Sequence, residues 1–167
     1  LVQLLKTGLA DHAAVMGPMA EVVAESTQHL ADTDLQAMVA YLQALSPATP
    51  APAAARLPPR DGTAMARGGR LYADHCAACH GSEGQGAPGA YPALAGNPIV
   101  TLPEPGNLVQ AITGGGFPPG TAGNPRPYGM PPFDLPHDDL AALATWLRAS
   151  WGHDAPPVAP VQVLLSR

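Results

Sequence analysis

Cys76, Cys79 and His80 form the pattern C-x-x-C-H, and the chain has no further cysteine. This pattern is typical of a site where a c-type haem is attached covalently. Two thiols three residues apart share one helical turn, so each can add to a vinyl group of the same porphyrin. The imidazole that follows can then bind the iron. The motif therefore predicts one haem c, anchored at Cys76 and Cys79, with His80 as the proximal ligand.

Other uses of such a motif agree less well with the rest of the chain. A dithiol redox site is expected among alternating strands and helices, and this sequence has almost no strand pattern. A zinc site would need two more ligands at matching spacing, and neither a second cysteine pair nor paired histidines are present. A disulfide between two cysteines this close would be strained. Haem attachment is the favoured interpretation.

Met130 is the candidate for the second iron ligand, within the segment YGMPPF at residues 128–133. The two prolines after it keep the segment out of a helix or sheet interior. His/Met ligation occupies both axial positions, raises the reduction potential and favours electron transfer over oxygen binding. The alternative is that Met130 only fills an apolar gap, as methionines often do. The other methionines belong to other segments: Met16, Met19, Met38 and Met65.

Composition fits a small helical protein whose cofactor supplies part of the core. The chain has 167 residues, of which 46% are hydrophobic, 21 are proline and 18 are glycine. These values predict one domain of usual size with long irregular loops. A formal charge of −5 and a single lysine, Lys6, argue against nucleic acid as a partner.

The location follows from the cofactor rather than from a targeting segment. No apolar run approaches the length of a membrane span, and no basic-plus-apolar signal opens the chain. Haem c is attached outside the cytoplasm, so an export signal is expected to have been removed or to lie upstream. We therefore predict a periplasmic protein that associates with a membrane only through its partners.

Proline and alanine dominate residues 47–60 (PATPAPAAARLPPR), a composition typical of a semi-rigid linker. The linker separates residues 1–46 from a haem domain at 61–151. A stretch with three prolines, residues 152–167, is expected to be an extended tail that packs on the domain or on a partner.

Helices dominate the expected structure of the haem domain. Asp61 is a candidate N-cap for a helix that leads into the cysteines. Prolines interrupt any periodicity from 81 to 106, and a short helix is expected at Asn107–Thr113. A helix from about Pro136 to Ser150 closes the domain. Its apolar face consists of Leu140, Leu143, Trp146 and Leu147. The predicted fold class is all-α.

Residues 1–46 repeat the second half of the haem domain. The segment Gly17-Pro18-Met19 parallels Tyr128-Gly129-Met130, and Asp34-Leu35 with Tyr41-Leu42 matches Asp139-Leu140 with Trp146-Leu147 at the same spacing. We interpret residues 1–46 as the C-terminal half of a preceding domain of the same kind, without a haem motif. Met19 therefore receives no ligand assignment. The segment could dock on the haem domain, pair with another chain or remain loose.

The haem domain resembles class I cytochrome c. The whole chain is similar to the C-terminal part of the tri-haem cytochrome c subunit of bacterial membrane-bound dehydrogenases for alcohols, gluconate or sugars. The segments that carry the closer resemblance are GPMAEVVAESTQHLADTDLQAMVAYLQAL, YPALAGNPIV, GGFPPGTAGNPRPYGMPPF and LRASWG. By this resemblance, the chain would cover the end of the second haem domain and all of the third.

The resemblance also implies roles for individual residues. Gly68 and Tyr72 would meet Leu143 and Trp146 where the first and last helices cross. Pro92 would accept the proton of the proximal imidazole through its carbonyl, which orients the ring and raises its basicity.

Further residues would surround the haem. Leu94 would pack on the porphyrin, and Trp146 would be a core aromatic that also touches the haem edge. Arg126 and Tyr128 are candidates for pairing with the propionates, since an arginine fork suits a carboxylate. The alternative for Arg126 is a solvated surface arginine.

The predicted function is single-electron transfer rather than catalysis. By resemblance, electrons would come from a dehydrogenase catalytic subunit and pass to quinone or another cytochrome. Two alternatives remain: a haem enzyme or ligand sensor with an open sixth position, and a docking module for a dehydrogenase complex. His75 is expected to face solvent. Surface or cap roles are expected for the remaining histidines: His12, His29, His137 and His153.

Overall fold

The computed structural model describes residues 1–45 and 61–166, so the predicted linker at 47–60 lies outside the described residues. Apart from one small antiparallel sheet and isolated bridges, the regular secondary structure of the described residues is helical, which confirms the predicted all-α class. That sheet pairs β1 (Leu9–Ala10) with β2 (Ala13–Ala14). The other elements of residues 1–45 are α1 (Val2–Thr7), α2 (Pro18–Glu25), the 3-10 helix η1 (Thr27–His29) and α3 (Asp32–Ala44).

Six helices follow in residues 61–166 as the structure describes them. They are α4 (Gly62–His75), α5 (Ala77–His80), α6 (Pro98–Thr101), α7 (Gly106–Gly114), α8 (His137–Leu147) and α9 (Pro160–Leu165). The predicted N-cap is confirmed, because an oxygen of Asp61 accepts a hydrogen bond from the Thr63 amide at 3.1 Å. Helix α8 ends three residues before the predicted Ser150.

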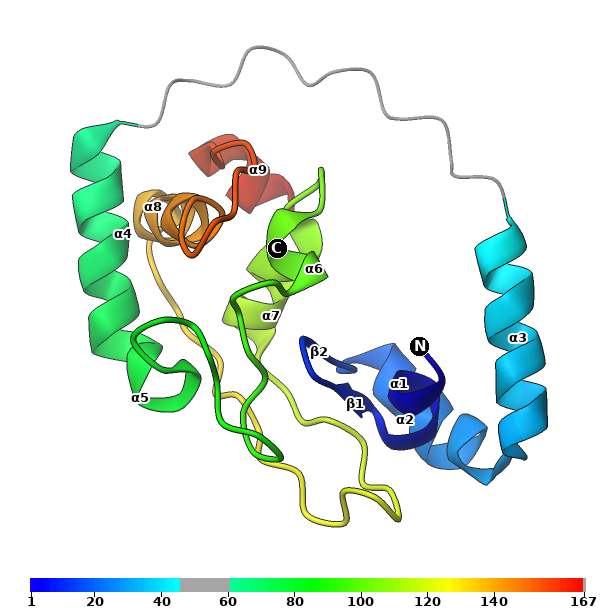
Figure 1. The fold of residues 1–167 in the computed structure, drawn as a ribbon. Coiled ribbons are helices and arrows are strands. Elements are labelled where there is room, and N and C mark those ends of the chain that lie inside the picture. The colour runs from blue at the N-terminus through cyan, green and yellow to red at the C-terminus, as the bar shows by residue number, and fades with distance from the viewer. Residues whose placement is uncertain (46–60, 167) are drawn as a thin grey trace.

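Helices α4 and α8 lie side by side, and their crossing point is Gly68 (Figure 1). A Cβ atom on Gly68 would collide with the carbonyl oxygen of Ala142 and lie 2.6 Å from the Cβ of Trp146. An ion pair between Arg67 and Asp139 joins the same two helices. The crossing is part of one hydrophobic cluster. Its buried members include Tyr72, Cys76, Val100, Val109, Ile112, Leu140, Leu143, Leu147 and Val163.

The tail differs from the extended segment expected from its prolines. Its last part folds into the six-residue helix α9, which packs on α8 and α7. Pro160 stands in the first turn, where a missing N–H costs nothing, and the Ala159 amide donates to the Gln162 side chain at 2.9 Å. Val158 and Val163 are buried. Packing of these valines on the core therefore stabilises a helix too short to form alone.

Arg148 is fully buried, and its hydrogen bonds connect the end of helix α6 to the tail. Its guanidinium donates to the carbonyls of Val100 at 2.9 Å, Leu102 at 2.8 Å and Pro156 at 2.7 Å. Burial lowers the pKa of this side chain, and the charge of Glu104 opposes that shift. One cation thus satisfies three carbonyls that end helix α6 and begin the tail. The sequence analysis gave this arginine no role.

Residues 1–45 dock against the loops of the haem domain, which is one of the three arrangements left open by the sequence (Figure 1). The hydroxyl of Thr121 donates to the carbonyl of Thr7 at 3.1 Å. Gly8 lies against Pro119, where any Cβ atom would collide with the proline ring. Within the segment, Lys6 donates to the Leu30 carbonyl at 2.6 Å.

The length and apolar content of a helix decide whether it could span a membrane. Among the described residues, none of the helices is both long and apolar enough to cross a bilayer.

Gly68→Ala should lower the free energy of unfolding by about 1–3 kcal/mol, because the added methyl group forces α4 and α8 apart. Gly62→Ala is the matched control, since it lies in the same helix with nothing within 4 Å of the added atom. The free energy of unfolding of the Gly62→Ala variant should be unchanged or rise by up to about 1 kcal/mol. Chemical denaturation of the haem-loaded protein measures both, and equal stability of the two variants would contradict the close crossing.

Candidate haem-binding site

The C-x-x-C-H motif lies where α4 passes into α5. The Cys76 amide donates to the Tyr72 carbonyl at 2.9 Å, and the His80 amide donates to the Cys76 carbonyl at 2.9 Å. The three motif residues therefore lie within about one helical turn. Gly81 ends the helix with a φ of 80°, a backbone conformation that suits glycine. The Tyr72 hydroxyl donates to the Gly81 carbonyl, which fixes the end of α5 against α4.

The two cysteines differ in their surroundings, and both are free thiols in this structure. Cys76 is buried within the hydrophobic cluster, whereas Cys79 is exposed. Burial above all, with the neighbouring Cys79, raises the pKa of Cys76 to about 11. The Cys76 thiol is therefore protonated near neutral pH in this structure and is a poor metal ligand.

His80 is held in a defined orientation by the loop that follows. Its Nδ1 lies 2.9 Å from the Pro92 carbonyl oxygen, and because a carbonyl only accepts, Nδ1 carries the proton. Burial lowers the pKa of His80, and the Pro92 hydrogen bond offsets only part of that shift. The ring is therefore neutral with its lone pair on Nε2, the form that binds a metal. The hydrogen bond implied by the resemblance is present.

The loop from Gly84 to Pro92 is tied back to the motif by backbone hydrogen bonds. The Gly86 amide donates to the His80 carbonyl at 2.7 Å, and the Leu94 amide donates to the Gly84 carbonyl at 2.7 Å. Gly86 has a φ of 66°, and a Cβ atom there would lie 2.5 Å from the Tyr91 carbonyl oxygen. Glycine at this position lets the loop fold tightly enough to bring the Pro92 carbonyl to His80.

Met130 is positioned by a two-way hydrogen bond with Gly116, which follows α7. The Met130 amide donates to Gly116 at 2.8 Å, and the Gly116 amide donates back to Met130 at 2.9 Å. Its half-buried side chain packs against the hydrophobic cluster that contains Cys76. Gly115 makes room for this bridge, since a Cβ atom there would lie 2.7 Å from the Pro132 nitrogen.

The four other predicted site residues form one half-buried pair and one exposed pair. Leu94 and Trp146 are half-buried and pack against the same cluster as Met130. Arg126 and Tyr128 are exposed, and the Tyr128 ring lies 5.3 Å from that of Tyr91. His75 is exposed as expected. The structure thus brings Leu94, Met130 and Trp146 to the cluster around Cys76, while the propionate roles of Arg126 and Tyr128 stay predictions.

Trp151 supports the proximal side and was missed by the sequence analysis. Its ring centroid lies 5.2 Å from those of both Tyr72 and Trp146, and its ring lies over Gly84, where a Cβ atom would approach it to 2.8 Å. Trp151 has a φ of 53°, which is unusual for a residue other than glycine. One available signal was that both tryptophans of the chain lie within six residues.

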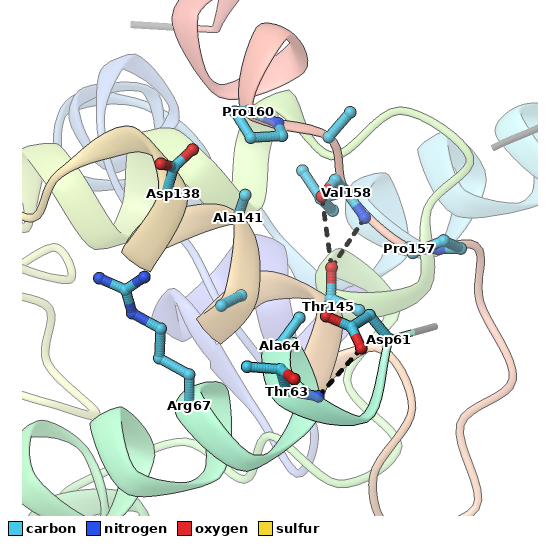
Figure 2. Close-up of a pocket in the computed structure, with 12 residues that line it drawn as sticks. Asp61, Thr63, Ala64, Arg67, Asp138, Ala141, Thr145, Pro157, Val158 and Pro160 are labelled. Atoms are coloured by element: carbon cyan, nitrogen blue, oxygen red, sulfur yellow. Dashed lines mark hydrogen bonds between the residues drawn. The ribbon is translucent and has the colours of Figure 1, made fainter. Parts of the chain in front are cut away.

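A shallow cavity of about 330 Å³ lies between the first turn of α4, helix α8 and the tail (Figure 2). Asp61, Ala141 and Val158 are among its lining residues. It lies at the opposite end of α4 from Cys76, so it is separate from the motif. Among the described residues, no group of three or more histidine, cysteine or acidic side chains is placed to hold a metal ion.

The geometry defines a protein that binds haem through a buried helix end and a flanking loop. The sequence model of the cytochrome c family matches residues 65–151, which is more than half of the chain. The chain therefore belongs to the cytochrome c family. This establishes electron transfer by a haem protein as its general function.

Several similar proteins are subunits of dehydrogenases. The cytochrome c subunit of alcohol dehydrogenase (quinone) from Gluconacetobacter polyoxogenes is 38% identical over 161 residues, which cover 91% of this chain and 34% of that protein. The gluconate 2-dehydrogenase cytochrome c subunit from Pantoea cypripedii is 32% identical over 164 residues, covering 93% and 37% respectively. The fructose dehydrogenase cytochrome subunit from Gluconobacter japonicus is 35% identical over 132 residues, covering 67% and 27%. The chain thus spans about a third of the length of these curated relatives.

The family implies covalent haem c, and the donor set fits it. A buried thiol, an exposed thiol and a neutral imidazole with a free Nε2 lone pair occur in the required order on one helix end. The Pro92 carbonyl strengthens the imidazole as a donor. Half-buried apolar side chains, including Leu94 and Met130, pack against the hydrophobic cluster that contains Cys76.

Gly86→Ala should displace the Pro92 carbonyl from His80, because the added atom meets the backbone of Tyr91, Pro92 and Ala93. The weakened hydrogen bond makes His80 a poorer donor, and the reduction potential should become more positive. Gly89→Ala is the matched control. It has a similar φ of 74° but nothing within 4 Å, so it carries the backbone strain of about 1–2 kcal/mol without the collision. Redox titration compares them, and equal potentials would contradict the proposed path from Gly86 to His80.

Proposed function

We propose that this protein carries single electrons through one covalent haem c whose iron is bound by His80 and Met130. The hydrogen bond of 2.9 Å between His80 and Pro92 is the observation that carries the proposal, because it fixes the proximal imidazole for metal binding. The bridge between Met130 and Gly116 supports it further, since it holds a thioether at the same hydrophobic cluster. Two protein ligands leave no open position for a substrate, which suits electron transfer.

The haem supplies the one-electron chemistry, and the chain supplies the surroundings. Cys76 and Cys79 anchor the ring, and His80 is oriented before any electron arrives. Leu94 and Trp146 exclude water from the ring, which sets a low local dielectric. His80 in its neutral form and the thioether of Met130 would bind the iron as uncharged donors.

The relatives suggest the place of this electron carrier in a larger reaction. Their names describe cytochrome subunits of alcohol, gluconate and fructose dehydrogenases. We therefore propose that a dehydrogenase catalytic subunit in the periplasm reduces this protein, and that quinone or another cytochrome oxidises it. Contact would occur at the exposed edge of the haem, over the small surface that is usual for transient redox partners.

Met130→Ala should remove the weak far-red sulfur-to-iron absorption band of the oxidised protein and allow the reduced protein to bind carbon monoxide. Met38→Ala, in helix α3, should change neither property. Absorption spectra of the oxidised, reduced and carbon monoxide-treated proteins measure this. A parent protein that lacks the band and binds carbon monoxide readily would have an open sixth position, and the haem enzyme or sensor interpretation would replace this proposal.

We also propose that residues 1–46 are the C-terminal half of a second cytochrome c-like unit. The repeat of the Gly17–Met19 and Tyr41–Leu42 patterns supports this, and so does an apolar surface on α2 and α3. Its exposed side chains are Met19, Val22, Met38, Tyr41 and Leu42, with Leu45 just after α3. A haem and its attachment segment would cover such a surface.

In a longer chain that carries a haem-attachment segment ahead of Leu1, Met19→Ala should open about one further haem per chain to carbon monoxide. The far-red band of the haem at His80 should remain. Val22→Ala, one helical turn away in α2, is the matched control and should leave both haems closed. Carbon monoxide titration of the reduced protein gives the number of open sites. No increase for Met19→Ala would contradict the proposal that Met19 is an axial ligand of the haem in this second unit.

A further inference from the structure

One peptide group of the proximal loop is held from both sides by histidines that come from opposite ends of the chain. The Ala95 carbonyl oxygen lies 3.0 Å from Nδ1 of His12, in the hairpin of residues 1–45. The amide of Gly96, in the same peptide group, donates to Nε2 of His153 at 2.9 Å. These contacts span 83 and 57 residues of sequence, so they are purely tertiary.

The protonation of both rings follows from their partners. His12 faces a carbonyl, so its Nδ1 donates. His153 accepts at Nε2, and its Nδ1 lies 3.0 Å from the Leu147 carbonyl oxygen, to which it therefore donates. A continuous chain of hydrogen bonds thus runs from His12 through the peptide group and His153 to the C-terminal end of α8. The two bonds to the peptide group are exposed, and the bond from His153 to Leu147 is part-buried.

This peptide group belongs to the same short loop as the Pro92 carbonyl. Between them, the amides of Leu94 and Ala95 both donate to the Gly84 carbonyl, and the Asn97 side chain donates to the Ala93 carbonyl at 3.0 Å. These bonds connect the Ala95–Gly96 peptide group and the Pro92 carbonyl within one hydrogen-bonded loop. A shift of the Ala95–Gly96 peptide group is passed to the carbonyl that orients His80.

We propose that His12 and His153 are positioning residues for the proximal ligand, and that through them residues 1–45 set the reduction potential of the haem domain. This inference rests on the proposed function, because it needs His80 on the iron. Removing either histidine releases the peptide group and lengthens the bond between Pro92 and His80. The imidazole becomes a weaker donor, the ferric state loses more than the ferrous state, and the potential rises.

The test uses His153→Phe, His12→Phe and the double variant in the haem-loaded protein. His153→Gln is the conservative replacement, because its amide can both donate and accept. His29→Phe is the matched control, as an exposed histidine of η1 outside the chain of bonds. Two readouts are measured: the reduction potential, and the hydrogen-exchange rate of the Gly96 amide by NMR of the ferrous protein.

His153→Phe should speed exchange at Gly96 by roughly three- to tenfold, the factor that corresponds to one lost neutral hydrogen bond. Its potential should become more positive, and His153→Gln should restore much of both effects. His12→Phe should shift the potential in the same direction. The double variant should shift it by less than the sum of the single variants, since both act on one peptide group.

Failure of this inference differs from failure of the proposed function. If the haem is attached and closed to carbon monoxide, but every histidine variant keeps the parent potential and Gly96 exchange, the positioning role is wrong and electron transfer stands. Faster exchange without any change in potential would also overturn it, because the histidines would then only stabilise the loop. A parent protein that binds carbon monoxide readily would instead overturn the proposed function.

Discussion

The close crossing of α4 and α8 at Gly68 is the contact on which the rest of the haem domain depends. Helix α4 carries the two cysteines at its C-terminal end, so its position against α8 decides where the haem is anchored. The missing side chain at Gly68 lets the two backbones touch, and one turn later Tyr72 packs on Trp146 at 4.7 Å between ring centroids. Because packed interiors tolerate little change in volume, this geometry is defined to within the size of a methyl group.

The proximal loop is the second level of organisation, and it is fixed mainly by polar contacts. His80 is oriented by a backbone carbonyl and not by a side chain, so no side-chain substitution removes this acceptor directly. The position of that carbonyl is set by glycines that permit a tight loop, by Trp151 above Gly84 and by histidines from outside the loop. The ligand geometry is therefore a property of many weak contacts rather than of one residue.

The sequence predicted the parts of this arrangement that depend on local pattern. The C-x-x-C-H spacing placed the motif, Asp61 marked the start of α4, and the apolar positions of α8 identified its buried face. The tail was predicted to be extended, because its proline content indicated a loop and the burial of Val163 was not visible in the pattern. Arg148 was also missed as a structural residue, and the surface or cap role expected for His153 did not include its contact with the Gly96 amide. Both act through backbone carbonyls or amides distant in sequence, and no spacing rule reveals such partners.

Residues 1–45 contact the haem domain through an exposed hydrogen bond of His12, a part-buried one of Thr121 and one close packing contact, while apolar side chains on α2 and α3 such as Met19 and Tyr41 are exposed. Thermodynamic linkage is reciprocal: if docking of the segment changes the reduction potential, then reduction of the haem must change the docking by the same free energy. A partner on the apolar surface of α2 and α3 would act on the haem through His12 only if its binding also changed this docking. Any effect of such a partner would therefore reach the iron through the polar contacts of the segment and not through its apolar surface.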